Sequence, residues 1–307
     1  MKRSTLLVPA LAGAALLTVS ACGSHDGMHT SSDVGSSASP SVDMSHGTDH
    51  GSMSGTDHGS MSGMTGHSTY SGNGLAASED GYTLKPTRSA LALGRQALTF
   101  QIIGSDGTPV TDYVEDQTKK LHLYLIRQDL TGYQHLHPTL TGDTWSIDVT
   151  VDKPGPYRMY TDFIAKDAQG TGHPLVLSTV LTAPGAYTPQ PLPAPATSTT
   201  VDGLTATFDG TVIAGKDSDL MVTVTSGGQP VTDLQPYLDS YAHLTAVRAG
   251  DAAYRHVHPE ETATAGKTGG PELHFMVDVP EKGEYRFFLQ VQRAGVLHTL
   301  PITLRVS

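Results

Sequence analysis

The feature that most limits the possible folds of this chain is an internal repeat. A Pro-Val-Thr-Asp segment at residues 109–112 returns 121 positions later at residues 230–233, and the histidine motifs that follow keep this offset without a gap. Further on, Gly-Pro-Tyr-Arg at residues 155–158 corresponds to Gly-Glu-Tyr-Arg at residues 283–286. Chance does not easily produce so many matches at one spacing, so we expect two homologous domains of the same fold.

Both copies show the pattern of β-structure. Apolar and polar residues alternate with a period of two at residues 98–102, 145–151 and 275–279, as in half-buried strands. Turn-forming pairs such as Asp106-Gly107 and Gly250-Asp251 recur about every ten residues, a spacing typical of short strands in a sandwich. We therefore expect an all-β protein with two tandem immunoglobulin-like β-sandwich domains.

Changes of composition along the chain indicate the domain boundaries. Residues 23–80 are rich in Gly, Ser, Thr, Asp, His and Met, and such a segment cannot bury enough apolar surface to fold. Four prolines between residues 187 and 200 favour an extended spacer. The expected organisation is a signal peptide with lipobox (1–22), a disordered tail (23–80), a first β-sandwich (81–186), a proline-rich linker (187–200) and a second β-sandwich (201–307).

The N-terminal segment has the layout of a secretory signal peptide. Lys2 and Arg3 precede an apolar stretch at residues 6–19, and small residues lead directly to Cys22. A cysteine in this position predicts acylation, so we expect export and a lipid anchor on Cys22 at the outer face of the cell membrane. Because Cys22 is the only cysteine, no disulfide and no thiolate ligand are available. The net charge of −11 argues against nucleic acid as a partner.

Each copy contains the motif His-x12-His-x-His-Pro. The candidate metal ligands of the folded domains are His122, His135 and His137 in the first copy and His243, His256 and His258 in the second. In a strand, residues i and i+2 point to the same face, so the last two histidines of each motif are neighbours.

A hairpin places the remaining histidine of each copy. Gly250-Asp251 predicts a two-residue turn, and pairing outward from it puts His243 opposite His258 and Thr245 opposite His256. Residues directly opposite share a face, so each copy gathers three histidines on one face of its hairpin. The interleaved leucines and valines should take the core face, and we expect the histidines to face outward or into a groove.

Three imidazoles on one face predict a metal site, since imidazole binds Zn, Cu, Fe and Ni. Solvated surface histidines without a metal are the alternative. A fourth ligand is not identified; His173, His298, Asp162, Met159 and a donor from the tail are candidates. Asp162 is weakened as a shared ligand because the matching position of the second copy holds Gln290.

The tail favours copper. The segment Gly-Thr-Asp-His-Gly-Ser-Met-Ser at residues 47–54 is repeated at residues 55–62, and residues 25–67 contain six histidines and five methionines. Thioether sulfur selects Cu(I), and imidazole adds affinity for Cu(I) and Cu(II), so copper is preferred over zinc. A flexible tether of biased composition is the alternative. The tail candidates are His46, His50, Met53, His58, Met61, Met64 and His67.

Two segments of the chain resemble known proteins. The His/Met-rich tail is similar to the tails of bacterial extracytoplasmic copper-handling proteins. His-Leu-His-Pro at residues 135–138, followed by Pro-Gly-Pro-Tyr-Arg-Met-Tyr-Thr-Asp-Phe at residues 154–163, resembles secreted bacterial proteins whose immunoglobulin-like domains are labelled copper- or heavy-metal-associated, or YtkA-like. The resemblance covers residues 81–307 and implies metal handling outside the cytoplasm.

The leading hypothesis is therefore a membrane-anchored copper-binding lipoprotein that buffers, scavenges or delivers copper, with another extracytoplasmic copper protein as a candidate partner. The alternative is a cell-surface β-sandwich interaction module without a metal role. We expect no enzyme activity, because the sequence contains no nucleophile motif, no Cys-His-Met blue-copper arrangement and no acid–base pair of recognisable spacing.

Overall fold

The computed structural model describes residues 73–307, with the exception of the side chain of His258. Within this part of the chain every regular element is a β-strand, which confirms the all-β prediction. No helix of the described part is long and apolar enough to cross a membrane. The predicted signal peptide, the lipidation site Cys22 and the tail candidates lie outside the described residues: His46, His50, Met53, His58, Met61, Met64 and His67.

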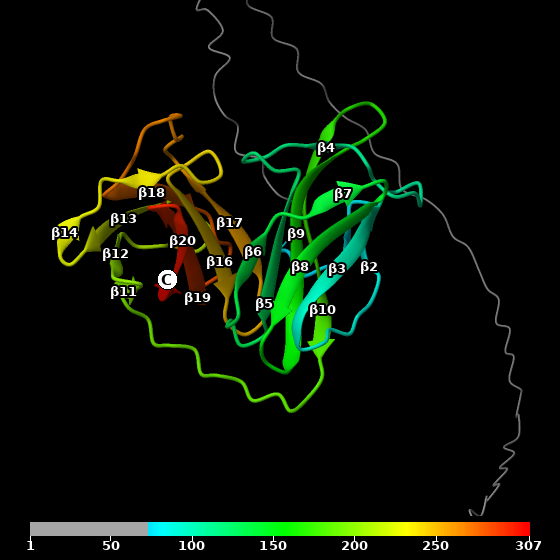
Figure 1. The fold of residues 1–307 in the computed structure, drawn as a ribbon, viewed down its shortest axis with the longest axis horizontal. Helices are drawn as coiled ribbons and strands as arrows, with labels where there is room; N and C mark the ends of the chain where they lie inside the picture. Colours follow the sequence, from blue (N-terminus) through cyan, green and yellow to red (C-terminus); the bar gives the residue numbers. More distant parts are fainter. Residues whose placement is uncertain (1–72) are drawn as a thin grey trace, which may run out of the picture. The chain divides into compact units, whose positions relative to one another are not determined.

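The first copy forms a sandwich of two five-stranded antiparallel sheets (Figure 1). One sheet has the order β1-β2-β3-β8-β7; the other has the order β10-β9-β5-β6, with β4 paired to β9. The strands are β1 (Ser78–Glu79), β2 (Tyr82–Pro86), β3 (Gly94–Ile103), β4 (Tyr113–Val114), β5 (Leu121–Arg127), β6 (Gln134–Leu136), β7 (Thr139–Thr141), β8 (Thr144–Val151), β9 (Gly155–Lys166) and β10 (Gly172–Ala183).

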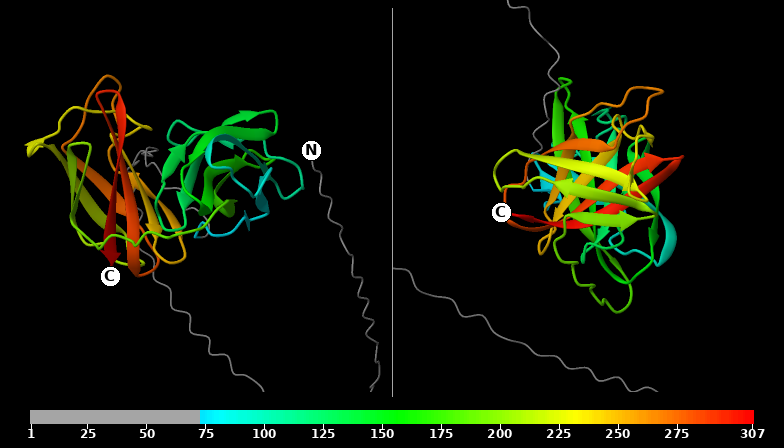
Figure 2. Two further views of the ribbon diagram at one scale, coloured as in Figure 1. Left: turned by 60° about the horizontal axis from the view of Figure 1, so that its bottom comes forward. Right: turned by 90° about the vertical axis from the view of Figure 1, so that its left-hand side faces the viewer.

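The second copy repeats this arrangement, and its strands can be followed in Figure 2. Here β17 pairs with strands of both layers, so the two sheets join into one continuous ladder. The strands are β11 (Ser198–Val201), β12 (Leu204–Asp209), β13 (Ser218–Ser226), β14 (Gln229–Pro230), β15 (Leu234–Gln235), β16 (Ala242–Arg248), β17 (Tyr254–Pro259), β18 (Glu272–Val277), β19 (Gly283–Arg293) and β20 (Val296–Val306).

Alternation of side chains builds a separate core in each sandwich. On β3, Leu98, Phe100 and Ile102 are fully buried, while the residues between them are partly exposed. Trp145 stacks on Phe100 in this core, with ring centroids 6.4 Å apart. The core of the second sandwich contains no tryptophan and rests on Val, Leu, Ile, Phe and Tyr side chains. The two tandem sandwiches predicted from the repeat are thus present.

The His-x-His-Pro motif lies where the chain passes from one sheet to the other. In the first copy, β6 pairs with β5 of one sheet, and β7 after Pro138 pairs with β8 of the opposite sheet. In the second copy β17 makes both connections itself. Proline lacks the N–H of a ladder donor, so it suits a point at which pairing changes partner.

The histidine faces were expected to point outward or into a groove, and the burial of His122, His135 and His243 excludes the outward orientation. All seven residues of β5 are buried, because Leu121, Leu123 and Leu125 enter the core while the opposite face packs on the second sandwich. Tyr124 and Ile126 on that face belong to an apolar cluster that both sandwiches share. The sequence pattern identified the core face correctly, but the other face is covered by protein rather than water.

The segment between β10 and β11 is fastened to the first sandwich. Arg127 donates a hydrogen bond to the carbonyl of Thr188 (3.1 Å) and lies over the ring of Tyr187, 4.6 Å from its centroid. Asp129 accepts a hydrogen bond from the backbone N–H of Gln190 at 2.8 Å.

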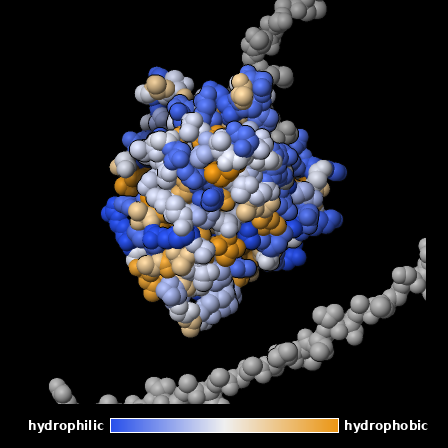
Figure 3. Space-filling view, turned by 90° about the vertical axis from the view of Figure 1, so that its right-hand side faces the viewer, coloured by the Kyte–Doolittle hydropathy of each residue, from blue (hydrophilic) through white to orange (hydrophobic). Residues whose placement is uncertain are grey.

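The strands of each sandwich begin three residues before the expected domain boundaries, since β1 starts at Ser78 and β11 at Ser198. Elsewhere, Figure 3 shows apolar side chains in small patches among polar ones.

Candidate metal centre

The two hairpins that carry the histidines have the predicted register. In the first copy Leu123 lies opposite Leu136 and Tyr124 lies opposite His135. In the second copy Leu244 lies opposite Val257 and Thr245 lies opposite His256. The registers are the same in the two copies, because each pair is displaced by the repeat length. In the first copy this pairing places His122, His135 and His137 on one face, as predicted.

His122, His135 and His137 converge in a triad whose ligand atoms all lie within 4.8 Å of one another. Nδ1 of His122 is 3.1 Å from Nε2 of His135. The ring of His137 packs edge-on against both other rings, with centroids 5.1 and 4.8 Å away. Nitrogen ligands about 2.0–2.1 Å from a tetrahedral metal ion lie about 3.3 Å apart, so the His122–His135 spacing suits a shared ion.

Hydrogen bonds determine the tautomers of His122 and His135, at the ring nitrogens that face away from each other. Nε2 of His122 faces the backbone carbonyl of Asp116 at 3.1 Å, and Nδ1 of His135 faces Oε1 of Gln290 at 2.7 Å. Both oxygens only accept, so each of these nitrogens carries the hydrogen of its neutral ring. The facing nitrogens, Nδ1 of His122 and Nε2 of His135, therefore both present lone pairs.

The third member adds a buried nitrogen without a partner. Nε2 of His137 is buried and has no hydrogen-bond partner among the described residues. A buried polar atom without a partner costs free energy, and two lone pairs 3.1 Å apart repel each other. A cation between His122 and His135 would remove the repulsion, and Nε2 of His137 would gain a partner as the third ligand.

A proton is a poor candidate for that cation. Burial lowers the pKa of His122 and takes that of His135 well below its usual value. Burial, together with the neighbouring His122 and Lys119, lowers the pKa of His137 to about 3. The three rings are therefore neutral near pH 7, which is the protonation state that binds metals.

His243 and His256 of the second copy lie against the first copy's triad. The His243 ring stacks on that of His135 with centroids 4.5 Å apart, and it lies parallel to His122 at 6.2 Å. The His256 ring lies 6.1 Å from that of His122. The hairpin faces thus meet in one buried histidine cluster at the contact of the two sandwiches. His258 belongs to the same hairpin, and its side chain lies outside the described residues.

His243 and His256 have polar partners from the first sandwich at both ring nitrogens. Nε2 of His243 lies 2.9 Å from the hydroxyl of Tyr124, and its Nδ1 lies 3.1 Å from Oε1 of Gln117. The amide nitrogen of Gln117 lies 2.8 Å from Nε2 of His256. Nδ1 of His256 lies 3.1 Å from Oδ2 of Asp162. These nitrogens already have partners from the first sandwich.

Asp162 is the one carboxylate in the described part of this cluster. It accepts a hydrogen bond from the hydroxyl of Tyr254 at 3.0 Å and pairs with His256, both side chains being buried. Burial by itself would lower the pKa of His256, but the Asp162 carboxylate outweighs it and raises that pKa. Burial alone would raise the pKa of Asp162, but His256 and His122 keep it low.

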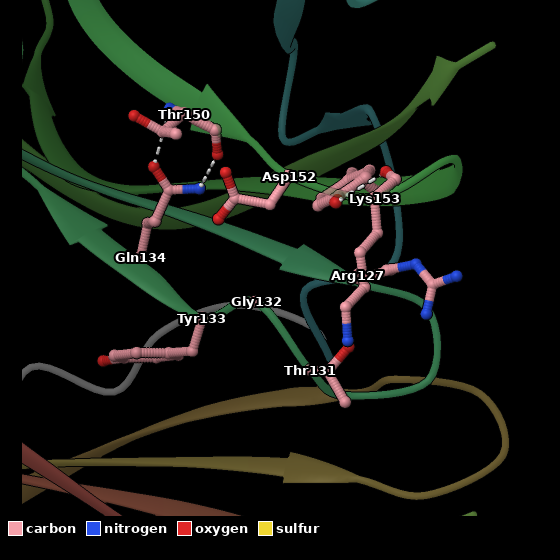
Figure 4. A pocket seen from close by; sticks show the side chains of 9 residues that line it. Arg127, Thr131, Gly132, Tyr133, Gln134, Thr150, Asp152 and Lys153 are labelled. Carbon is pink, nitrogen blue, oxygen red and sulfur yellow. Dashed lines mark hydrogen bonds between the residues drawn. The ribbon is translucent and has the colours of Figure 1, made fainter. Parts of the chain in front are cut away.

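A surface cavity of about 510 Å³ lies beside the cluster rather than at it. Figure 4 shows its wall, on which the hydroxyl of Tyr133 points away from Arg127 and Lys153. That hydroxyl reaches Oγ1 of Thr245 at 3.1 Å and Oε1 of Gln290 at 3.5 Å. Tyr133 therefore stands between the cavity and the residues that surround the triad.

Three proposed fourth ligands are not brought to the triad. Nε2 of His173 pairs with Asp167 at 3.0 Å, and Nδ1 of His298 pairs with Asp202 at 3.1 Å. In the ladder His298 adjoins Thr299, the partner of Gln290, so it points to the other face of its sheet. Val176 pairs with Asp162, and His173 is three residues from Val176. Residues an odd number apart in a strand point to opposite faces, so His173 points away from the face of Asp162. Met159 is buried in the core of the first sandwich.

Of the fourth-ligand candidates among the described residues, Asp162 is the one that the structure brings into the cluster. Sequence reasoning missed two polar residues there, Gln290 and Gln117. Gln290 lies opposite His243, at the position equivalent to that of Asp162 opposite His122. The signal that could have found Gln290 is this cross-strand position beside a predicted ligand, whereas Gln117 lies outside any motif.

Comparisons with known structures show weak likeness. Escherichia coli α2-macroglobulin activated by porcine elastase is 12% identical over 73% of this chain and 20% of its own length, with a TM-score of 0.24. A Corynebacterium diphtheriae protein described as membrane-anchored is 11% identical over 75% of this chain and 59% of its own, with a TM-score of 0.21. This chain thus spans less than two thirds of either protein.

No curated protein matches the chain. A family model described as a domain of unknown function, DUF8832, matches residues 76–179 and 199–307, which together contain nearly all of both sandwiches and all the histidines of the cluster. Because these two segments make up more than half of the sequence, the chain belongs to the DUF8832 family.

Proposed function

We propose that this chain is an exported, lipid-anchored copper-binding protein that holds one metal ion on His122, His135 and His137 and buffers or delivers it. The observation that carries the proposal is the convergence of three imidazoles, two of which face each other with nitrogens 3.1 Å apart, while Nε2 of the third is buried without a hydrogen-bond partner among the described residues. Neutral imidazoles with their outer nitrogens hydrogen-bonded to oxygen are the usual arrangement of histidine ligands around a metal.

The choice of copper rests on the tail. Three neutral imidazoles accept copper or zinc, so the donor set of the triad leaves the metal open. The five methionines among residues 25–67 supply soft sulfur ligands, which favour Cu(I) over zinc. The proposed division of work is capture by the tail and retention by the triad.

The point at which the described chain begins supports transfer between tail and triad. The carbonyl of Asn73 accepts a hydrogen bond from the backbone N–H of Tyr254 at 3.1 Å. The hydroxyl of Tyr254 contacts Asp162 in the histidine cluster. Asn73, at the start of the described residues, is therefore connected to the cluster through Tyr254.

We assign the site to binding rather than catalysis. His122 and His135 are buried and His137 is partly buried, which leaves little room for a substrate beside the ion. The nearest carboxylate, Asp162, is already engaged with Tyr254 and His256, so it is poorly suited to act as a general base.

The test is metal binding by the whole protein and by two double variants. His135→Ala with His137→Ala should lose the tightly bound ion. His173→Ala with His298→Ala removes two histidines that pair with surface carboxylates, and it should bind as the parent does. Metal content and competition with a Cu(I) chelator measure both. Equal binding by all three proteins would refute the triad and favour an interaction module without a metal role.

The same titrations test the choice of metal. Replacing Met53, Met61 and Met64 with leucine removes three thioethers while the imidazoles remain. We expect this variant to lose Cu(I) bound in excess of one ion per chain and to keep its zinc binding. Unchanged Cu(I) binding would show that the tail methionines are not ligands.

A further inference from the structure

We propose that Gln290, which belongs to the second sandwich, is the positioning residue that makes His135 of the first sandwich a metal ligand. The inference rests on the proposed function and adds to it that the metal site is complete only while the two sandwiches are in contact. Its ligand is a copper or zinc ion of the kind that three imidazoles bind.

The amide of Gln290 is held in one orientation. Its nitrogen donates to Oγ1 of Thr299 at 3.3 Å, and the hydroxyl of Tyr133 approaches its oxygen at 3.5 Å. The oxygen therefore faces Nδ1 of His135 at 2.7 Å. The Gln290 side chain is only 3% exposed, so water cannot replace it as the acceptor.

This contact selects the tautomer of His135. An oxygen that can only accept keeps the hydrogen on Nδ1 and leaves the lone pair on Nε2, which faces Nδ1 of His122. Without Gln290 the hydrogen can move to Nε2, where it would form an ordinary hydrogen bond to His122. The two rings would then satisfy each other, and the site would lose its preference for a cation.

Gln290 also makes the orientation of a first-sandwich ligand depend on the second sandwich. His122 is oriented by a carbonyl of its own sandwich, that of Asp116, whereas His135 is oriented from across the contact. Metal affinity and sandwich contact are then linked, and by thermodynamic reciprocity the bound ion strengthens the contact as the contact strengthens binding.

A second glutamine supplies the matched control. Gln117 crosses the same contact in the opposite direction, from the first sandwich to His243 and His256, and it touches no nitrogen of the triad. Gln117→Met and Gln290→Met are the same chemical change at the same contact. Both remove buried hydrogen bonds, so their effects on folding should be similar.

The experiment uses the full chain with Gln290→Met, Gln290→Glu and Gln117→Met. Affinity is measured for Cu(I) by chelator competition and for Co(II) by its visible absorption, which also reports the ligand geometry. We expect Gln290→Met to weaken binding about 10–100-fold and to change the Co(II) spectrum. Gln290→Glu, which restores an acceptor, should bind at least as tightly as the parent. Gln117→Met should stay close to the parent in affinity and spectrum.

Two results would overturn the inference. Equal losses in Gln290→Met and Gln117→Met would mean that the contact matters only as a whole. A loss in Gln290→Glu as large as in Gln290→Met would mean that the acceptor is irrelevant. Failure of the proposed function looks different, since the parent itself would then bind no metal or the His135 and His137 double variant would keep it.

Discussion

His122 and His243 hold equivalent positions in the repeat and are equally buried, yet their nitrogens face different partners. Nδ1 of His122 faces the nitrogen of another neutral histidine, whereas Nδ1 of His243 faces the amide oxygen of Gln117. On the opposite edge, His122 meets a backbone carbonyl and His243 meets the hydroxyl of Tyr124. The first ring therefore keeps a lone pair for a cation, and the second is satisfied without one.

The difference arises from residues outside the histidine motif. Tyr124 supplies its hydroxyl to His243, but the equivalent residue in the second copy, Thr245, bonds Tyr133 instead. Asp162 puts a charge beside His256, where the equivalent Gln290 puts an amide beside His135. Identical ligand spacing thus does not imply identical sites, because the partners of the outer nitrogens decide which lone pairs remain available.

The comparison predicts that the stability of the protein depends on pH, and that the buried histidines do not all contribute in the same direction. Burial lowers the pKa of four histidines below the ordinary value of 6.5: His122, His135, His137 and His243. Below pH 6.5 the unfolded chain therefore binds more protons than the folded protein does. Stability should fall by up to about 1.4 kcal/mol per pH unit for each of these residues, several kcal/mol in all. Urea unfolding of metal-free protein at pH 7.5 and 5.5 measures this.

His256 contributes in the opposite sense. Its pKa is raised by Asp162 despite burial, so its contribution to stability is full below pH 6.5 and is lost as the pH rises through its folded-state pKa. Removing the carboxylate with Asp162→Asn should therefore make the loss at acid pH steeper. An unfolding free energy that does not change between the two pH values would contradict the burial of neutral histidines.

Two single substitutions, one at the equivalent histidine of each copy, test this comparison directly. His122→Ala removes a ligand and should lower metal affinity more than about 100-fold, beyond the loss expected for an outer partner. His243→Ala removes the equivalent ring of the second copy and should leave one ion per chain bound. Isothermal titration gives affinity and stoichiometry for both. Two ions in the parent, one lost in each variant, would instead make the copies equal.

The buried pair of Asp162 and His256 allows a further test, which measures the free energy of unfolding. Asp162→Asn should destabilise the protein by about 2 kcal/mol at pH 7, less than the full cost of breaking a buried pair because His256 can lose its proton. Asp148→Asn, in an exposed pair with Arg95, is the matched control and should cost less than about 1 kcal/mol. Equal values from urea unfolding would mean that the inner pair contributes no more than a surface pair.

The smallest effect is expected at the outer histidines. Asp167→Asn removes the partner of His173, whose side chain is 39% exposed, and should change the unfolding free energy by less than about 0.5 kcal/mol. Metal affinity should not change either, because His173 does not face the triad. A measurable loss of metal binding in this variant would indicate that His173 is a metal ligand.

Much of the site could be predicted from sequence, because it depends on local pairing. The turn at Gly250-Asp251 sets the register of the β16–β17 hairpin, and β5–β6 has the equivalent register. Alternation along those strands separates Leu123 and Leu244 from the histidine faces. Hairpin partners are close in sequence, so turn chemistry and the hydrophobic pattern suffice to place them.

The contact between the two copies could not be predicted in this way. A face that carries His122, Tyr124 and Ile126 contains too much polar surface to be recognised as a buried interface from its pattern alone. Its burial became possible because a second, similar face supplies partners for the polar atoms, as Gln117 does for His243. Such complementarity depends on how two sheets pack, which no spacing along the chain encodes.

The sequence by itself determined the repeat, the two β-sandwiches and the grouping of three histidines on each hairpin, since these follow from periodicities of two residues and from turns. Only the tertiary structure decided that the two hairpins meet, that Gln290 rather than a carboxylate faces Nδ1 of His135, and that the triad among the described residues belongs to the first copy. The physical reason is that a histidine's role depends on which atom faces each ring nitrogen, and those atoms come from distant parts of the chain.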